Sequence, residues 1–375
     1  MAKRLLVTST ELMMIQFLVP HICHLKEEGY IIDLACSNVG GRMDEVYSRL
    51  QDTVNQIHEV RLVRSPLSLE NRKGYGDLKK IIDQGNYDLI WTNEPVMGVM
   101  TRLAARTTRR QGTKVLYMIH GFHFFRGAPL LYWMAFYPIE RFMANECDMI
   151  CTINTDDYRQ ALKFACPNVR YIHGIGVNTE RMNIGTDTDI RTELSLSEKD
   201  FLVLTVAELN ANKNQKVVIE SLSILNDPSV HYLLCGIGDR LEKLQEQTEE
   251  LGLSGQVHFL GYRKDVLNIA RQSDLFILPS HREGLPLAMM EAMYNGLPVL
   301  GGNIRGVNDL IDSNQGGYFI NNDDPEDVAE KIALIKNNET KRKQFGEYNQ
   351  KKVIPFLLEN TKEEVAQVLC DLSGC

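Results

Sequence analysis

Short aliphatic runs alternate with longer segments of mixed polarity along the whole chain. Most of these runs are apolar at consecutive positions, as in strands that are buried on both faces. Strands of that kind, separated by helices, are typical of a parallel sheet covered on both sides. In the first half of the chain the pattern predicts strands at 4–9, 31–36, 56–60, 88–91, 114–120, 149–153 and 169–172.

The same alternation begins again in the second half. Amphipathic segments predict helices in both halves, and the first helix should end at Gly29, a usual helix terminator. A last helical segment at 340–372 is interrupted near Pro355. The second series of strands is expected at 201–207, 231–235, 256–260, 275–278 and 298–300, and helices are expected at 11–28, 215–225 and 240–251.

A polar stretch at 178–200 separates the two series and predicts a linker. The chain has 375 residues, which is long enough for two domains. We therefore predict an α/β protein with two doubly wound, Rossmann-like domains at 1–178 and 179–355, and a C-terminal helix at 356–375 that packs back on the first. Ligands of such sheets bind beyond the carboxyl ends of the strands, so we expect one central cleft that both domains face.

Composition and charge exclude several classes of protein. With 44% hydrophobic and 24% charged residues the chain is neither disordered nor collagen-like, and a net charge of −8 argues against nucleic acid as a partner. The eight cysteines show no C-x-x-C spacing, so we expect free thiols and neither a zinc site nor a disulfide framework. The first apolar run ends at Thr8, too early for a signal peptide, and the longest one contains Glu140 and Arg141. We expect a cytoplasmic protein.

The segment 280–293 carries the strongest candidate chemistry. Gly284 and Pro286 suit a tight turn between a strand and a helix, whose amino end offers backbone N–H groups and partial positive charge to a phosphate. Glu283 and Glu291 are separated by about 12 Å if the rise is helical throughout. That spacing fits one carboxylate on a sugar and the other on a ribose, with a diphosphate between them. The alternative is a helix-capping Glu283 and a solvated Glu291.

The residues of this segment resemble the signature of the retaining glycosyltransferases of family 4, which have the GT-B fold. Glu283 is followed by Gly-x-Pro, and Glu291, after seven intervening residues, is followed by Ala-Met. Segments 120–129, 208–215 and 235–239 are similar to the branch that builds bacterial capsular polysaccharides and exopolysaccharides. The resemblance extends over nearly the whole chain.

The resemblance implies a nucleotide-sugar donor, UDP-linked in this branch, and transfer with retention of the anomeric configuration. The acceptor would be a glycan or a saccharide linked to undecaprenyl diphosphate. It would bind the first domain, 1–178, and the nucleotide sugar would bind the second, 179–355. The family's front-face mechanism uses the donor phosphate to deprotonate the acceptor hydroxyl and needs no protein nucleophile, and neither a cofactor nor an essential metal is implied. Asp187-Thr188-Asp189 is similar to the metal-binding motif of another glycosyltransferase fold, but it lies in the predicted linker and is interpreted as solvated.

Residue by residue, the resemblance implies that Glu283 binds hydroxyls of the donor sugar and that Glu291 binds the two ribose hydroxyls. Lys213 would pair with the diphosphate and stabilise the leaving group, and His120 would face the donor and the acceptor across the cleft. The catalytic candidates are therefore His120, Glu283 and Lys213, and the donor-binding candidates are Glu291, Gly236, Gly238, Arg263, Gly284, Leu285, Pro286 and Asn210.

Several of these residues have a structural alternative. A lysine in a polar loop is usually solvated, and a histidine that ends an apolar strand is often a satisfied core residue. Gly236 and Gly238 suit either close approach to a nucleotide or the opening of a helix. Many relatives also carry an arginine five residues before the lysine, where this chain has Glu208. The diphosphate should then rely on the lysine, on helix N-terminal amides, and on Arg263 or Arg282.

Basic and aromatic residues in the first half of the chain point to a membrane contact. Arg102, Arg106, Arg109 and Arg110 recur at helical spacing, and an aromatic-rich stretch follows at 122–137. A basic and aromatic surface suits peripheral binding to anionic lipid at the inner face of the cell membrane. A solvated helix face beside an ordinary core is an equally good interpretation.

Other functions fit parts of the pattern. A UDP-sugar 2-epimerase or a glycan phosphorylase has the same two-domain architecture, although segment 280–293 favours transfer and no pyridoxal-phosphate lysine context is apparent. A non-catalytic sugar-nucleotide-binding partner of another transferase is a further alternative. The presence of Glu283, Lys213, Glu291 and His120 in one chain argues against it.

Overall fold

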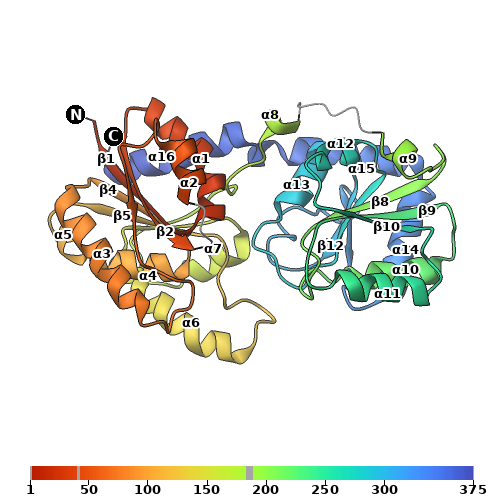
Figure 1. Ribbon diagram of the computed structural model, residues 1–375, viewed down its shortest axis with the longest axis horizontal. Helices are drawn as coiled ribbons and strands as arrows, with labels where there is room; N and C mark the ends of the chain where they lie inside the picture. The colour runs from red at the N-terminus through yellow and green to blue at the C-terminus, as the bar shows by residue number, and fades with distance from the viewer. Residues whose placement is uncertain (1, 40–42, 183–188, 375) are drawn as a thin grey trace. The chain divides into compact units, whose positions relative to one another are not determined.

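The computed structural model describes residues 2–39, 43–182 and 189–374 (Figure 1). The chain divides into two compact units, here called unit 1 and unit 2. Unit 1 comprises Met1–Gly176 and Leu358–Cys375, and unit 2 comprises Val177–Leu357. The sequence pattern placed the two borders within two residues of these positions, at 178/179 and 355/356.

Unit 1 contains a seven-stranded sheet in the order β3-β2-β1-β4-β5-β6-β7, in which all neighbouring strands are parallel. The order reverses between β1 and β4, which makes the ends of these two strands the topological switch point of the sheet. The strands are β1 Arg4–Glu11, β2 Ile31–Val39, β3 Gln56–Glu59, β4 Leu89–Asn93, β5 Lys114–Ile119, β6 Met149–Thr152 and β7 Val169–Tyr171.

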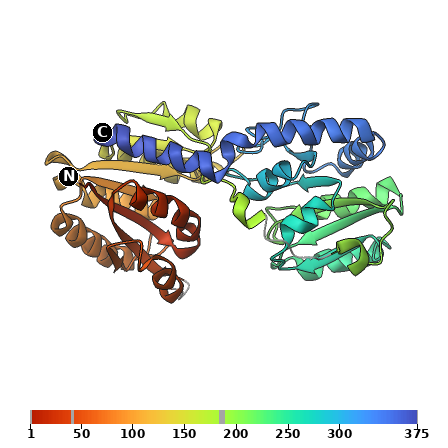
Figure 2. The same cartoon turned by 90° about the horizontal axis from the view of Figure 1, so that it is seen from above.

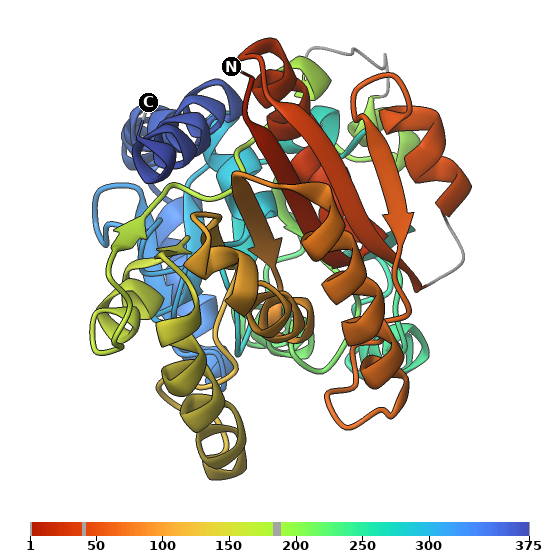
Figure 3. The same cartoon turned by 90° about the vertical axis from the view of Figure 1, so that its left-hand side faces the viewer.

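Helices cover both faces of this sheet, as the runs of buried residues in the strands require (Figure 3). Helix α1 packs beside α16, and α3 packs beside α4. The helices of unit 1 are α1 Leu12–Glu27, α2 Met43–Leu50, α3 Glu70–Gly85, α4 Pro95–Ala104, α5 Arg106–Arg110, α6 Leu130–Met143, η1 Ala144–Glu146, α7 Thr155–Ala161 and α16 Leu358–Ser373.

Unit 2 contains a six-stranded sheet in the order β10-β9-β8-β11-β12-β13, again with parallel neighbours. Its switch point lies between β8 and β11. The two sheets confirm the prediction of two Rossmann-like, doubly wound domains. The strands are β8 Phe201–Val206, β9 Val230–Cys235, β10 Val257–Gly261, β11 Leu275–Leu278, β12 Val299–Gly302 and β13 Gly317–Ile320.

The hydrophobic core of unit 2 has two layers, one on each face of the sheet. Helices α10, α11 and α14 contribute buried residues to one layer, and α9, α12 and α13 contribute to the other. The helices of unit 2 are α8 Thr179–Met182, α9 Ile190–Glu193, α10 Lys216–Leu225, α11 Leu241–Glu250, α12 Val266–Arg271, α13 Leu287–Tyr294, α14 Pro325–Lys336, α15 Glu339–Lys352 and η2 Ile354–Phe356.

The C-terminal helix α16 belongs to unit 1 although it follows unit 2 in the chain (Figure 2). Its last residue is tied to the start of the chain, because Lys3 Nζ donates to Ser373 Oγ over 2.8 Å. A second link joins His173 Nδ1 to Glu364 Oε1 at 2.8 Å. The break predicted near Pro355 corresponds to η2, where the chain leaves α15 and turns into α16.

Three predictions about special segments can be compared with the structure. Seven of the eight cysteines lie in the described residues and all seven are free thiols, as expected. Asp189 caps α9 through its side chain, while Asp187 and Thr188 lie outside the described residues. Across 2–39, 43–182 and 189–374, no helix combines the length and apolar character needed to cross a bilayer.

Candidate functional site

The switch point of unit 2 brings together two loops that are far apart in the sequence. One loop follows β8 and the other follows β11, and these strands are neighbours in the sheet. His281 donates its backbone N–H to the carbonyl of Asn212 over 2.8 Å, and Asn212 Nδ2 donates to the carbonyl of Arg282 over 3.0 Å. The loops therefore form one surface at the place where doubly wound sheets bind ligands.

An ion pair between Lys213 and Glu283 joins the tips of these loops. Lys213 Nζ lies 2.6 Å from Glu283 Oε1, and the carboxylate side chain is only 10% exposed. The structural alternative of a solvated lysine is therefore wrong for Lys213. Asn210 supports the pair from below, because its Oδ1 accepts a hydrogen bond from the Lys213 backbone N–H over 3.1 Å.

Helix α13 begins four residues after Glu283. Its N-cap is Pro286, which makes no side-chain capping bond, and the helix begins at Leu287. Glu283 is therefore not the capping residue, and its carboxylate is left for other chemistry. Gly284, Leu285 and Pro286 connect it to the amino end of α13, where the helix dipole favours negative charge. Glu291 lies half-buried within α13.

Arg305 supports the Glu283 loop, although the sequence pattern did not single it out. It is 7% exposed, and its Nε donates to the Glu283 carbonyl over 3.1 Å. The next residue, Gly306, lies so close that a Cβ there would meet the Gly284 carbonyl oxygen at 2.1 Å. The only sequence feature that could have indicated Arg305 is its position before a glycine and shortly after a buried strand. That feature is weak evidence for a site residue.

The side-chain amides of two buried asparagines, Asn214 and Asn322, link the two loops through hydrogen bonds. Asn322 Nδ2 donates to the carbonyl of Ser280 over 2.7 Å, and Asn214 Nδ2 donates to the carbonyl of Asn322. Asn322 comes from the segment after β13, so three separate segments meet here. These amides were not predicted as site residues, since their role depends on packing between distant segments.

Comparison with known proteins agrees with this geometry. The model of glycosyl transferases group 1 matches residues 186–352, and that of glycosyltransferase family 4 matches residues 21–181. The putative glycosyltransferase EpsD of Bacillus subtilis is 34% identical over 359 residues, which cover 94% of this chain and 92% of that protein. The chain belongs to the family 4 glycosyltransferases. The family predicted from segment 280–293 is thereby confirmed.

Two further relatives of the glycosyltransferase bear on its fold and partners. An Escherichia coli protein named UDP-Gal:alpha-D-GlcNAc-diphosphoundecaprenol alpha-1,3-galactosyltransferase is 26% identical, with coverage of 83% of this chain and 81% of that one. The crystal structure of Anabaena Alr3699/HepE in complex with UDP superposes with a TM-score of 0.81 at 18% identity, over 99% of this chain and 100% of that one. The second match confirms the GT-B fold.

Two glycines of the glycosyltransferase have a clear structural reason. A Cβ on Gly236 would lie 1.8 Å from the carbonyl oxygen of Ala207, and one on Gly238 would lie 2.2 Å from that of Leu209. Both glycines thus let the segment after β9 pack directly on the loop after β8. This contact accounts for the glycines without a ligand, and their approach to a nucleotide stays a prediction.

Arg263 is bound by two carboxylates in the structure. Its guanidinium donates two hydrogen bonds to Asp265, at 2.8 and 2.7 Å, and two to Glu193, at 2.8 and 3.1 Å. These two carboxylates raise the pKa of Arg263 and neutralise its charge. Arg263 therefore lies in an ion-pair network between α9 and α12, and its contact with the diphosphate stays a prediction.

His120 lies directly after β5, as predicted, and its protonation is set by its neighbours. Burial lowers the pKa of His120 to about 4, with a smaller contribution from His21. Asn93 Nδ2 donates to the Thr8 carbonyl, which leaves Asn93 Oδ1 to accept from His120 Nε2 over 3.0 Å. His120 is therefore neutral at pH 7, with the proton on Nε2 and an acceptor lone pair on Nδ1.

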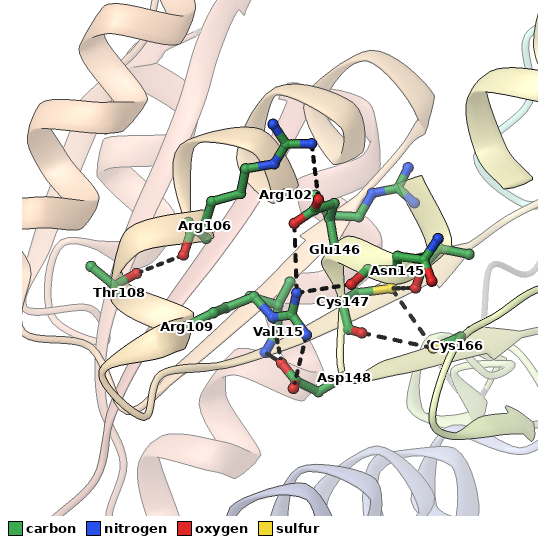
Figure 4. A network of polar contacts seen from close by, with 12 residues as sticks. Arg102, Arg106, Thr108, Arg109, Val115, Asn145, Glu146, Cys147, Asp148 and Cys166 are labelled. Carbon is green, nitrogen blue, oxygen red and sulfur yellow. Dashed lines mark hydrogen bonds and ion pairs between the residues drawn. The ribbon is translucent and has the colours of Figure 1, made fainter. Parts of the chain in front are cut away.

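The basic helix face predicted in unit 1 does not form as a whole, because three of its four arginines are paired with carboxylates (Figure 4) and only Arg110 is exposed. Arg102 is fully buried and bonds Glu140 over 2.8 Å. Arg109 donates to Asp148 at 3.0 and 3.1 Å. Arg106 pairs with Glu146 at 2.9 Å. This surface is thus not a free cationic patch for anionic lipid.

The aromatic residues expected at a membrane also have structural roles. Phe122 and Phe124 are buried and their rings stack at 4.5 Å, while Trp133, Phe136 and Tyr137 of α6 pack against the same core. The outer side of α6 is nevertheless apolar. Its exposed large apolar residues are 47% to 73% accessible and comprise Leu130, Leu131, Met134, Ile139 and Phe142.

Proposed function

We propose that this glycosyltransferase moves a sugar from a UDP-linked donor to a saccharide carried on undecaprenyl diphosphate, with retention of the anomeric configuration, in the synthesis of a cell-surface polysaccharide. The observation that carries the proposal is the Lys213–Glu283 pair at the switch point of unit 2. The name of the E. coli relative supports the donor and the lipid-linked acceptor, and the UDP complex of HepE supports the nucleotide.

The ion pair explains how one site can bind both ends of a sugar diphosphate. In the protein alone, Lys213 and Glu283 neutralise each other. A bound donor replaces each partner: its diphosphate takes the lysine, and its sugar hydroxyls donate to the carboxylate. Negative charge then grows on the leaving UDP as the glycosidic bond breaks. Lys213 stabilises that charge in a partly buried site, where such an interaction is strong.

Retention follows if the acceptor attacks from the face that UDP leaves. The bond from the anomeric carbon to the phosphate oxygen breaks, and the bond to the acceptor oxygen forms on the same side. The acceptor proton passes to the departing phosphate, so UDP leaves protonated and the charges balance. The protein contributes positioning and charge stabilisation. His120 offers an unprotonated Nδ1 to a hydroxyl of the donor or the acceptor.

Transfer of radiolabel tests the proposal directly. Membranes that contain lipid-linked acceptors are incubated with labelled UDP-sugars, each first ranked by the rise in melting temperature it produces. Glu283→Ala should abolish transfer, while Glu246→Ala, an exposed carboxylate on α11, should leave it unchanged. NMR of the product should show the donor's anomeric configuration, and EDTA should have no effect because no metal is expected.

Other results would contradict specific parts of the proposal. Unchanged transfer by Glu283→Ala would remove the site assignment. Saturable binding of a UDP-sugar without transfer to any acceptor would favour the non-catalytic partner, and release of a C2-epimerised sugar would favour the epimerase.

We further propose that α6 is the membrane contact of the enzyme. The helix projects from the body of unit 1 (Figure 3), and its outer side chains are apolar. Arg126 and Arg141, both exposed, lie before the helix and near its end, where cations can meet anionic headgroups. A lipid-linked acceptor requires that the enzyme work at the bilayer surface, which is why lipid is the occupant that we infer for this face.

Liposome sedimentation distinguishes this surface from ordinary exposed residues. Leu131→Glu combined with Phe142→Glu should abolish binding to vesicles that contain phosphatidylglycerol. The matched control is Leu67→Glu, because Leu67 is 92% exposed but lies outside α6. Equal sedimentation of the double variant and the wild type, or no binding by the wild type, would contradict the proposal.

A further inference from the structure

Two cysteines of unit 1 are in contact at the edge of the sheet where β6 and β7 begin. Cys147 follows η1 and precedes β6, and Cys166 lies between α7 and β7. Their sulfur atoms are 3.8 Å apart (Figure 4). This edge is opposite to the carboxyl ends of the strands, where His120 lies after β5. The pair is therefore separate from the residues proposed to take part in transfer.

The register of the sheet explains why these two cysteines meet. Strands β6 and β7 are parallel neighbours in which Ile150 pairs with Val169. Cys147 and Cys166 are separated by the same number of positions, 19, and both come shortly before that pair. Neighbouring strands lie about 4.8 Å apart, and the Cα atoms of a disulfide are usually about 4.4 to 6.8 Å apart. Two cysteines that face each other at this edge are therefore within reach of a covalent bond.

The backbone around the two sulfur atoms is already held together. Asn168 Nδ2 donates to the Asp148 carbonyl over 3.0 Å, and the Ile150 backbone N–H donates to the Asn168 carbonyl over 2.9 Å. To bond, the sulfur atoms must approach from 3.8 Å to about 2.0 Å. Rotation of the two side chains can supply an approach of that size while the strands stay paired.

The two thiols differ in the properties that decide which one reacts first. Cys166 is partly exposed, whereas Cys147 is fully buried. The hydrogen bond between the two sulfur atoms lowers the pKa of Cys166. The same bond, together with burial, raises the pKa of Cys147. Because the thiolate is the reactive form of cysteine, Cys166 is the residue that an oxidant in solution should attack first.

Two arginines near Cys147 favour a second step. The charges of Arg102 and Arg109 lower the pKa of Cys147, against the hydrogen bond to Cys166 and the burial that raise it. Oxidation converts the Cys166 thiolate into a neutral group, which no longer opposes negative charge on Cys147. The buried thiol then ionises more readily, beside the sulfur atom that it has to attack.

We propose that Cys147 and Cys166 form a modification site at which hydrogen peroxide converts the two thiols into a reversible disulfide. The Cys166 thiolate attacks one peroxide oxygen, the O–O bond breaks, and hydroxide leaves, so that Cys166 becomes a sulfenic acid. The Cys147 sulfur then attacks the Cys166 sulfur, the S–O bond breaks, and a second hydroxide leaves. The protons of the two thiols turn both hydroxides into water. Two thiols are thus oxidised and one peroxide is reduced.

The disulfide should stabilise unit 1 under oxidising conditions. It closes a loop that contains β6 and α7, and a closed loop has less conformational freedom in the unfolded chain. For this loop length and a unit of this size, we expect the melting temperature of unit 1 to rise by about 6 to 12 °C. Trp91 and Trp133 both lie in unit 1, so their fluorescence measures the change.

Peptide mapping by mass spectrometry tests the inference on the full chain, without any transfer reaction. The reduced protein is treated with hydrogen peroxide and digested. Two peptides linked through Cys147 and Cys166 should appear, and dithiothreitol should separate them. Cys166→Ser should lose both the linkage and the rise in melting temperature. Cys23→Ser, the matched control at another partly exposed cysteine, should behave as wild type.

Trapping with dimedone, which reacts with sulfenic acids, tests the order of the two steps. Cys147→Ala removes the second thiol, so the sulfenic acid at Cys166 should persist and take up about tenfold more dimedone than in the wild type. Absence of the Cys147–Cys166 linkage in peroxide-treated wild type would overturn the inference whether or not the variants fold. Equal dimedone labelling of Cys166 in both proteins would overturn the order of attack, and a linkage without a rise in melting temperature would overturn the stabilising role.

Discussion

Lys213 and Glu283 show how a single contact fixes the chemistry of the donor site. A lysine paired with a carboxylate at 2.6 Å is held at one point, so it does not have to be ordered when the donor binds. The same pairing gives a cationic partner to a carboxylate whose side chain is only 10% exposed. Before the donor binds, Lys213 and Glu283 neutralise each other. In the proposed complex, the diphosphate replaces Glu283 as the partner of Lys213, and the sugar hydroxyls replace Lys213 as the partner of Glu283.

Removal of the lysine should slow the chemical step rather than only weaken binding. We predict that Lys213→Met lowers kcat by a factor of about 100 to 1,000, the usual effect of losing one charge-stabilising donor. Steady-state kinetics with the UDP-sugar identified by thermal shift measure kcat and KM separately. Lys216→Met, which removes an exposed cation three positions on, should behave as wild type. A pure rise in donor KM would mean that Lys213 only binds substrate.

Buried histidines link the stability of the enzyme to pH. Burial lowers the pKa of His21 to about 4, below the value of about 6.5 in an unfolded chain. Because the unfolded state binds the proton more tightly, stability is full above pH 6.5 and falls as the pH drops toward 4. Unfolding in urea should show a loss of about 2 kcal/mol per such histidine between pH 8 and pH 5. His21→Gln should reduce that loss, and an unchanged pH dependence would contradict it.

At the scale of elements, α4 and α6 are joined by a buried ion pair that the sequence pattern could not reveal. Arg102 lies under the ring of Tyr117, 3.9 Å from its centroid, and bonds Glu140 of α6. Helical spacing shows which residues share one face, but it does not show whether that face meets solvent or another helix. The one indication in the sequence was Glu140, because a carboxylate inside an apolar run needs a buried cationic partner such as Arg102.

We predict that Arg102→Met destabilises unit 1 by about 3 to 5 kcal/mol, because it leaves Glu140 charged and buried. Urea unfolding measures the change. Arg110→Met, on the exposed part of the same arginine cluster, should change stability by less than about 0.5 kcal/mol. The double variant Arg102→Met/Glu140→Leu should recover most of the loss, since apolar residues replace a buried pair without an unpaired charge. A single variant as stable as wild type would show that the pair is dispensable.

A local sequence pattern does not show which distant segment a residue contacts, and this explains which parts of the fold and the site were predictable. Fully buried strands such as β4 and β11 can be predicted from their runs of mostly apolar residues. Strand β13 was missed because it is short, starts at Gly317 and is buried only at its ends. The family motif identified Glu283 and Lys213 in sequence, whereas Arg305 and Asn322 act through contacts with distant segments that no local pattern encodes.

At the scale of the whole molecule, the path of the chain makes unit 1 dependent on residues that follow unit 2. Helix α16 buries Val365, Val368, Leu369 and Leu372, and Arg170 of β7 pairs with Asp371 at 2.6 Å. Full burial of each such aliphatic side chain contributes about 1.5 to 3 kcal/mol. Their sum is comparable to the whole stability of a domain, about 5 to 15 kcal/mol. Unit 2, in contrast, keeps both layers of its core between Val177 and Leu357.

A chain that ends at residue 357 should therefore lose unit 1 and keep unit 2. The two tryptophans, Trp91 and Trp133, both lie in unit 1, so their fluorescence reports on that unit alone, while far-UV circular dichroism reports on both. We predict that tryptophan emission is already that of an unfolded chain without urea, whereas the dichroism retains a cooperative transition. A chain that ends at residue 373 keeps α16 and should unfold as wild type. Native tryptophan emission in the shorter chain would show that the core of unit 1 is complete without α16, against the contacts that place this helix in it.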